Sequence, residues 1–228
     1  MMLGKILRPL IEAFLRPIDG GLGERLRYHY YRRKFRSCGC NVRIGINVKL
    51  VGLGHISVGD DVWIDDNCIL NAGLPDSFGD REVKCRENPD YGAADGQLRL
   101  GSNIHLAPGC ILNGFGGGIE IGDHCGLSSG VKIYSMSNHY CSFEDPSRIT
   151  YSNPMTKGLP VVLSVWPVKV GCNVFITIGA IVLGGTIGEN SYVAPGSLVI
   201  GRFPPNRILS GTPARRRGPR FKTQAQEN

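Results

Sequence analysis

A six-residue period runs through most of the chain. Each of eleven units opens with a large aliphatic residue and carries a small or β-branched residue four places later. The units begin at Ile44, Val58, Ile64, Leu100, Leu106, Ile121, Leu127, Val170, Ile176, Ile187 and Val193. Neither an amphipathic helix nor a simple hairpin repeats every six residues. The period predicts an all-β fold, a parallel β-helix of hexapeptide repeats whose short strands stack coil upon coil.

Three segments interrupt the period. Residues 74–97 are polar and contain Pro75 and Pro89, residues 113–118 are rich in glycine, and residues 138–167 are the longest excursion. Loops extruded from a regular scaffold are the usual place for binding and catalytic residues. We therefore expect the functional side chains in or beside these insertions.

The two ends of the chain differ from the repeat. Residues 3–16 place apolar residues three and four apart, which predicts an amphipathic helix, and residues 24–36 predict a second, basic helix. The helices either cap the β-helix, as solenoids require, or rest on an anionic membrane surface. We expect helices over 1–37, the β-helix domain over 38–205 and a basic tail over 206–228.

Composition limits the compartments and the classes of partner to be expected for the protein. The formal charge of +7 is concentrated at the two ends, yet no nucleic-acid-binding motif accompanies it. No apolar run reaches the roughly 18–20 residues that span a bilayer, and residues 1–19 lack the features of a secretory signal. Cys68, Cys110 and Cys125 fall on the small inward position of the repeat, where a reduced thiol fills space. We expect a cytoplasmic protein that binds no nucleic acid, with contact of residues 1–36 with the inner membrane left open.

Beyond the repeats, two segments carry a family resemblance. They are Ser137-Asn138-His139, which leaves the coil at the base of the long insertion, and the tail from Val193-Ala194-Pro195-Gly196 to Gly211-Thr212-Pro213-Ala214-Arg215. With the repeats, they resemble the hexapeptide-repeat acyltransferases, which include maltose, galactoside and serine acetyltransferases, over residues 38–217. The resemblance implies a left-handed coil, a homotrimer with each active site between two subunits, and acetyl-CoA as the acyl donor.

The resemblance also implies roles for particular residues. His139 would be the general base, since an imidazole with a pKa near 6.5 suits proton transfer at neutral pH. Asn113 and Glu144 are candidates for binding the acceptor, and either could instead orient the base. The expected contacts with coenzyme A are Ile178, Gly179, Ala180, Pro195, Arg215 and Arg216. The chain departs from the family at Phe175, where tryptophan is common, and in a shortened turn at 183–185.

The expected function is acetyl-CoA-dependent O-acetylation of a sugar during cell-surface polysaccharide synthesis. Gly23-Glu24-Arg25-Leu26-Arg27 and Asn113-Gly114 are similar to the branch of the family with that role. The sugar could be free, nucleotide-linked or lipid-linked. The alternatives are a xenobiotic or amino-sugar N-acetyltransferase and a non-catalytic scaffold. A zinc carbonic anhydrase on the same coil is disfavoured because His105, His124 and His139 are dispersed and Cys38-Gly39-Cys40 has no second pair, so we expect no metal.

Overall fold

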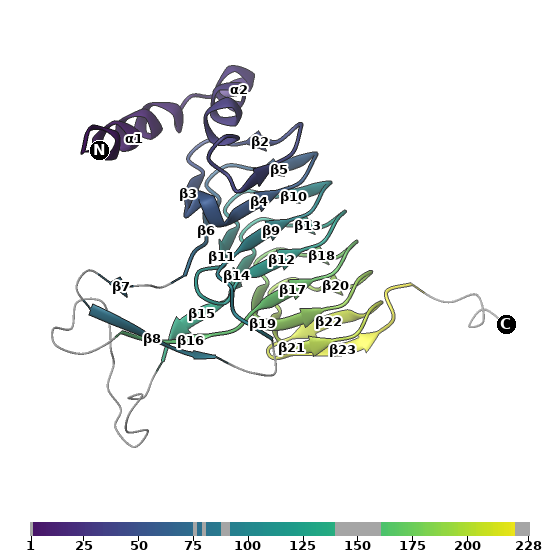
Figure 1. Ribbon diagram of the computed structural model, residues 1–228. Helices are drawn as coiled ribbons and strands as arrows, with labels where there is room; N and C mark the ends of the chain where they lie inside the picture. The colour runs from purple at the N-terminus through teal and green to yellow at the C-terminus, as the bar shows by residue number, and fades with distance from the viewer. Residues whose placement is uncertain (1, 75–76, 79–80, 88–91, 140–160, 222–228) are drawn as a thin grey trace.

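The chain folds into a stack of short parallel strands with two helices at its N-terminal end (Figure 1). The computed structural model describes residues 2–74, 77–78, 81–87, 92–139 and 161–221. Strands of successive coils pair in register, for example Ile104–Leu106 with Val62–Ile64. The hexapeptide prediction of an all-β parallel coil is confirmed.

The coil has three faces, each a ladder of parallel strands. The first face contains β1 (Ser37–Cys38), β4 (Ile56–Val58), β9 (Leu98–Leu100), β12 (Ile119–Ile121) and β17 (Val168–Val170). The second contains β2 (Arg43–Ile44), β5 (Val62–Ile64), β10 (Ile104–Leu106), β13 (Gly126–Leu127), β18 (Phe175–Ile176), β20 (Tyr192–Val193) and β22 (Ile208–Gly211). The third contains β3 (Lys49–Val51), β6 (Ile69–Asn71), β11 (Ile111–Asn113) and β14 (Lys132–Tyr134). The chain visits the faces in this order in every coil, so each corner of the prism recurs along one edge.

The shortened turn at 183–185 becomes part of a long strand. β19 (Ile181–Ile187) begins on the third face beside β14, ends on the first face beside β17, and pairs along its length with β21 (Leu198–Phe203). Gly184 and Gly185 take positive φ angles of 72° and 92°, a conformation that glycine adopts without steric cost. The missing residue of the repeat is thus absorbed by two glycines at this corner.

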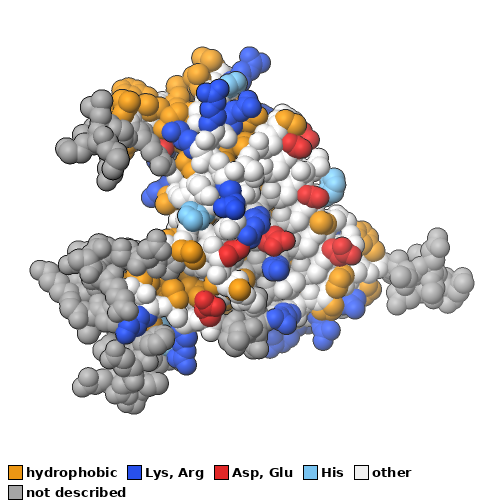
Figure 2. All heavy atoms as spheres, in the orientation of Figure 1, with side chains coloured by type: hydrophobic (Ala, Val, Ile, Leu, Met, Phe, Trp, Pro, Cys, Tyr) orange, Lys and Arg blue, Asp and Glu red, His pale blue; other side chains and the backbone are white. Residues whose placement is uncertain are grey.

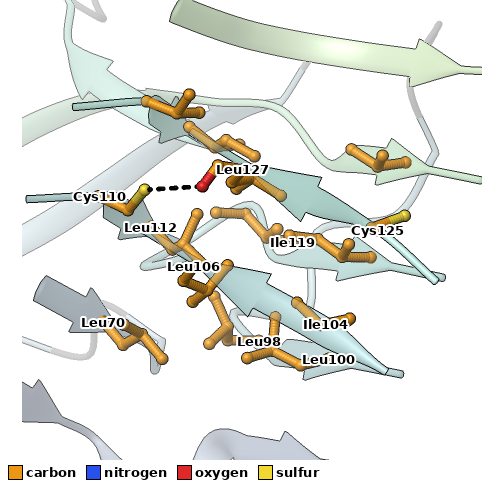
Figure 3. Close-up of a cluster of buried hydrophobic side chains, with 14 of the residues drawn as sticks. Leu70, Leu98, Leu100, Ile104, Leu106, Cys110, Leu112, Ile119, Cys125 and Leu127 are labelled. Carbon is orange, nitrogen blue, oxygen red and sulfur yellow. Dashed lines mark hydrogen bonds between the residues drawn. The ribbon is translucent and has the colours of Figure 1, made fainter. Parts of the chain in front are cut away.

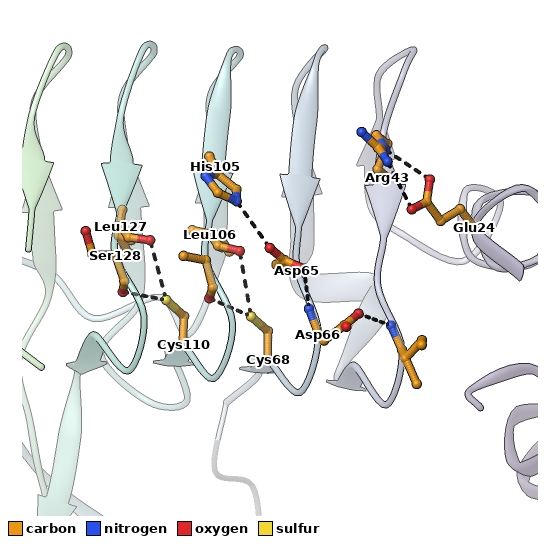
Figure 4. Close-up of polar contacts among 12 residues, drawn as sticks. Glu24, Arg43, Asp65, Asp66, Cys68, His105, Leu106, Cys110, Leu127 and Ser128 are labelled. Atoms are coloured by element: carbon orange, nitrogen blue, oxygen red, sulfur yellow. Dashed lines mark hydrogen bonds and ion pairs between the residues drawn. The ribbon is translucent and has the colours of Figure 1, made fainter. Parts of the chain in front are cut away.

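The core is a column of aliphatic side chains inside the prism (Figure 3). Cys68, Cys110 and Cys125 are buried there as expected. The Cys68 thiol donates to the Ala107 carbonyl at 3.3 Å, and the Cys110 thiol donates to the Ser128 carbonyl at 3.3 Å (Figure 4). Burial raises the pKa of Cys125 to about 11, so this thiol stays protonated at neutral pH.

All three interruptions of the period leave the coil at one corner, between the third and first faces. They follow β6, β11 and β14. The two longer ones contribute β7 (Ser77–Phe78), β8 (Arg81–Glu87), β15 (Met136–Asn138) and β16 (Val161–Val165), which join in the order β15-β16-β8-β7. This lateral sheet projects from the side of the prism (Figure 1). The insertions expected to be loops therefore build a second sheet with its own apolar cluster around Leu163.

The two N-terminal helices differ in how they contact the coil. α2 (Gly20–Tyr31) packs on the end of the coil, where the buried Arg27 donates from Nε to the Ile44 carbonyl at 2.7 Å and from Nη1 to the Ile18 carbonyl at 2.6 Å. Arg27 is thus a structural tie and not part of an exposed basic patch. α1 (Met2–Leu15) instead exposes Leu7, Leu10 and Phe14. Figure 2 shows apolar side chains beside lysine and arginine at this end. No helix of the described chain is long and apolar enough to cross a membrane.

Part of the expected basic tail belongs to the coil. β22 pairs in parallel with β20, and β23 (Ala214–Gly218) folds back on β22 through a cis peptide bond between Thr212 and Pro213. Arg215 and Arg216 lie on β23 and are exposed. The second face therefore ends in an antiparallel hairpin that displays these two cations.

Candidate active site

His139 lies directly after β15, and only 6% of it is exposed. Its Nδ1 is 2.7 Å from the Ser164 hydroxyl oxygen, and its Nε2 is 3.1 Å from Nη1 of Arg86. A guanidinium can only donate hydrogen bonds, so Nε2 must be the unprotonated nitrogen. Nδ1 then carries the hydrogen and donates to Ser164. The ring is held as the neutral tautomer with its lone pair on Nε2, the form that a general base needs.

The surroundings of His139 keep the ring uncharged. Burial, and to a smaller extent the positive charge of Arg86, lowers the pKa of His139 below its ordinary value of 6.5. At neutral pH the imidazole is therefore uncharged. A lower pKa also makes it a weaker proton acceptor, which limits the reactions that it can assist.

The lateral sheet explains how these three side chains meet. Arg86 of β8 is directly opposite Ser164 of β16, and the His139 amide donates to the Val162 carbonyl at 3.0 Å. Alternation along β16 sends Val161, Leu163 and Val165 into the apolar cluster and Ser164 to the opposite face. The sequence interpretation missed Arg86 and Ser164. Alternation within 83–87 and 161–165 was the available signal, but it has meaning only once the two insertions are known to pair.

A groove of about 480 Å³ lies where the third face meets the lateral sheet. Its lining is Asn113, Tyr134, Met136, Ser137, Asn138, Trp166 and Leu183. The Asn113 side-chain oxygen accepts from the Asn71 side-chain amide at 3.2 Å and from the Phe115 amide at 3.3 Å. Asn113 thus lines the groove together with Asn138, the residue that precedes His139 in the chain. Glu144, the other expected acceptor residue, lies outside the described residues.

The residues expected to meet coenzyme A gather along a different edge, between the second and third faces. Ile178 and Gly179 occupy this corner in one coil and Pro195 in the next; the Gly196 amide donates to the Ile178 carbonyl at 2.9 Å. We call Ile178, Gly179 and Pro195 the Ile178 edge. All three are exposed, and Ile178 is 64% exposed. Ala180 is buried, with its amide donating to the Thr177 carbonyl at 3.1 Å, so it shapes the edge from inside.

The second face carries a hollow of about 270 Å³ next to this edge, and His105, Gly126, Phe175 and Ile178 are among its lining residues. His105 stacks on Trp63 with 4.8 Å between ring centroids, and its Nε2 is 3.4 Å from the Asp65 carboxylate (Figure 4). His124 has a φ of 58° and serves as a corner residue. Within the described part of the chain, no three His, Cys, Asp or Glu side chains group closely enough to hold a metal.

His139 and the Ile178 edge are separated within one chain. Each third-face strand begins at the corner of the prism that carries the Ile178 edge and ends at the corner that bears the lateral sheet. Three residues of strand span about 10 Å, whereas proton transfer and acyl transfer need contact distances. Within one chain, the two features therefore lie at opposite ends of the third face.

Known proteins share sequence and fold with this chain. No family model matches the chain. The chain is 30% identical over 166 residues to the dTDP-4-amino-4,6-dideoxy-D-glucose acyltransferase of Escherichia coli, covering 70% of this chain and 72% of that enzyme. It is similar in structure to AntD, an N-acyltransferase from Bacillus cereus in complex with dTDP and 3-hydroxybutyryl-CoA, with a TM-score of 0.63, 25% identity, and coverage of 85% of this chain and 87% of AntD.

A second solved structure shares the fold at lower identity. It is the hexapeptide-repeat acetyltransferase VCA0836 of Vibrio cholerae, with a TM-score of 0.52 and 18% identity, covering 94% of this chain and 89% of that one. From its sequence and its coil, this chain belongs to the hexapeptide-repeat acyltransferases, the enzymes built on the left-handed parallel β-helix.

Proposed function

We propose that this enzyme transfers an acetyl group from acetyl-CoA to the amino group of a nucleotide-linked sugar. The observation that carries the proposal is the imidazole of His139, held in one neutral tautomer by Arg86 and Ser164 directly after β15, the strand that lines an open groove. The resemblance to an acyltransferase of a dTDP-linked amino sugar supports the acceptor class. This choice replaces the O-acetyltransferase expectation as the leading candidate.

The chain's residues would act in the following order. The acceptor nitrogen attacks the thioester carbonyl, and a carbon–nitrogen bond forms as the carbonyl electrons move onto oxygen. His139 Nε2 takes the proton from that nitrogen. Collapse of the tetrahedral intermediate breaks the carbon–sulfur bond, and the imidazolium gives its proton to the departing thiolate. The amide and the free thiol account for every atom, and His139 returns to its neutral form.

The low pKa of His139 favours an amine over a hydroxyl acceptor. An amine attacks with its own lone pair and becomes acidic as the new bond forms, so a weak base is enough to remove its proton. A hydroxyl must lose its proton while it attacks, which demands a stronger base. O-acetylation of a polysaccharide precursor remains the second candidate, supported by the similarity of Asn113-Gly114 to that branch of the family.

The donor would bind at the Ile178 edge of a neighbouring protomer. Ile178, Gly179 and Pro195 are exposed on successive coils, and Ala180 supports them from the core. Arg215 and Arg216 on β23 are available to pair with coenzyme A phosphates, since guanidinium groups bind phosphate in a forked geometry. A homotrimer supplies such a neighbour to every protomer. We place this enzyme in the cytoplasm, with α1 in peripheral contact with the membrane through Leu7, Leu10 and Phe14.

Release of free coenzyme A thiol in the presence of defined acceptors tests the function. The panel contains a dTDP-linked 4-amino sugar, the same compound with a hydroxyl in place of the amine, and the amino sugar without the nucleotide. We expect thiol release and an acetylated product with the dTDP-linked amine, and release slower by roughly two to four orders of magnitude from His139→Ala. Acetylation of the hydroxyl compound alone would favour the second candidate. Inactivity of the wild-type protein with the whole panel would refute the nucleotide-sugar assignment.

A further inference from the structure

Arg86 occupies the position from which His139 has to work. Its Nη1 is 3.1 Å from Nε2, on the only lone pair that the neutral ring offers for proton transfer. An acceptor amine cannot give its proton to Nε2 while the guanidinium donates there. Arg86 must therefore move away from the imidazole before His139 can act as a base. Its positive charge then needs a negatively charged partner.

Within the described residues, Arg86 forms no ion pair with a carboxylate. Arg86 is exposed on β8. Within the described residues, its side chain hydrogen-bonds to His139. Lys84 lies two residues earlier on the same strand, in register with Val162, so the two side chains share one face of the lateral sheet. β16 adds the uncharged Ser164 to that face. A guanidinium resting on a neutral nitrogen is an incomplete pairing, because arginine binds phosphate and carboxylate far more strongly.

We propose that Arg86 binds the diphosphate of the nucleotide-linked acceptor and that this move frees Nε2 of His139 for catalysis. The inference rests on the proposed function, because it assigns a residue to the anionic part of that acceptor. Pairing with phosphate would also neutralise the charge that weakens the base, since Arg86 contributes to the low pKa of His139. The base would thus become available and stronger only when the correct acceptor is seated.

Steady-state kinetics of Arg86→Gln and Arg86→Lys test the assignment against Arg202→Gln, a matched control at an exposed arginine of β21. We expect Arg86→Gln to raise the KM for the dTDP-linked acceptor by roughly 10- to 100-fold, with the KM for acetyl-CoA unchanged. The KM of Arg86→Lys for the same acceptor should lie between those of the wild type and Arg86→Gln, since lysine keeps the positive charge but cannot donate two parallel hydrogen bonds. With the amino sugar lacking the nucleotide, Arg86→Gln should have a higher kcat/KM than the wild type, because no guanidinium then occupies Nε2. An unchanged KM for the dTDP-linked acceptor in a folded Arg86→Gln protein would overturn the proposal.

A second measurement does not depend on turnover. Nuclear magnetic resonance of carbon-13-labelled histidine, with His139 assigned from His139→Ala, follows the imidazole titration directly. Arg86→Gln should move the His139 titration to higher pH, and dTDP should do the same in the wild type but not in the variant. If no acceptor is acetylated, the proposed function fails while this readout still decides the role of Arg86. A His139 titration unmoved by saturating dTDP would refute the exchange.

Discussion

His139 differs from the other histidines of the chain in what holds it. His105 stacks on Trp63 on the outer surface, His124 occupies a left-handed corner, and His29 contacts the Arg25 carbonyl within α2 at 2.8 Å. Each of these rings has a local structural role. His139 alone of these four is buried in the lateral sheet, with Nδ1 against the Ser164 hydroxyl and Nε2 against the Arg86 guanidinium.

Removing this imidazole should abolish most of the activity and little of the stability. We predict that His139→Ala lowers kcat by roughly two to four orders of magnitude, the usual contribution of a general base. Thiol release with the dTDP-linked amino sugar measures the effect. His29→Ala is the matched control, because His29 is exposed on α2, and it should retain wild-type turnover. Near-normal kcat in folded His139→Ala would remove His139 from the mechanism.

The loss of activity at low pH should follow the protonation of the His139 imidazole. The base acts unprotonated, so activity is lost as the pH falls through the pKa of His139, which burial and Arg86 set below 6.5. We predict that the acid limb of kcat/KM has an apparent pKa below 6.5 and that Arg86→Gln moves it upward. A limb at or above 6.5 in the wild type would show that another group, or a charged His139, governs activity.

The elements divide into those that a local pattern determines and those that it does not. Each hexapeptide unit turns the residue four places after its aliphatic inward, which is why the inward positions of Cys68 and Cys110 could be predicted. The lateral sheet depends on pairing Val83 with Val161, from two separate insertions. No local sequence period predicts pairing between two separate insertions, so Arg86 and Ser164 could not be assigned to the site from the sequence. Arg27 was likewise grouped with a basic patch, because only the packing of α2 on β2 shows that it is buried.

The corner within β19 depends on its glycines. Gly185 has a φ of 92°, and a Cβ at this position would overlap the Gly201 carbonyl oxygen. We predict that Gly185→Ala lowers the free energy of unfolding by roughly 2–4 kcal/mol, from backbone strain and overpacking together. Chemical denaturation measures it. Gly54→Ala is the control, since Gly54 has open space around its Cα, and equal stability of the two variants would contradict the corner's geometry.

On the scale of the whole molecule, the two ends present different surfaces. The helical end exposes Leu10 and Phe14 of α1, whereas the other end exposes the arginines of β23. We predict that wild-type protein cosediments with vesicles containing phosphatidylglycerol and that Leu10→Glu with Phe14→Glu weakens this binding roughly tenfold or more. Phe221→Glu, near the opposite end, should have no effect. Absence of wild-type binding would exclude the membrane contact and leave the helices with their capping role.

The proposed function makes the assembly part of the chemistry, because His139 and the Ile178 edge lie at different edges of one protomer. A monomer would carry half of two sites, one at each edge, and the acyl donor and the base would never meet. The sequence resemblance implied a homotrimer. The positions of these edges give that expectation a physical reason, since every protomer in a closed ring lends its Ile178 edge to a neighbour's base.

Mixing two inactive variants tests this arrangement most directly. His139→Ala removes the base, and Ile178→Glu places a negative charge at the exposed donor edge, where it should repel coenzyme A phosphates. Each variant alone should be inactive. Subunits exchanged at equal amounts should regain about a quarter of wild-type turnover, the share of intersubunit sites that pair an intact base with an intact edge. If mixed trimers, verified by native mass spectrometry, remain inactive, the site does not lie between protomers.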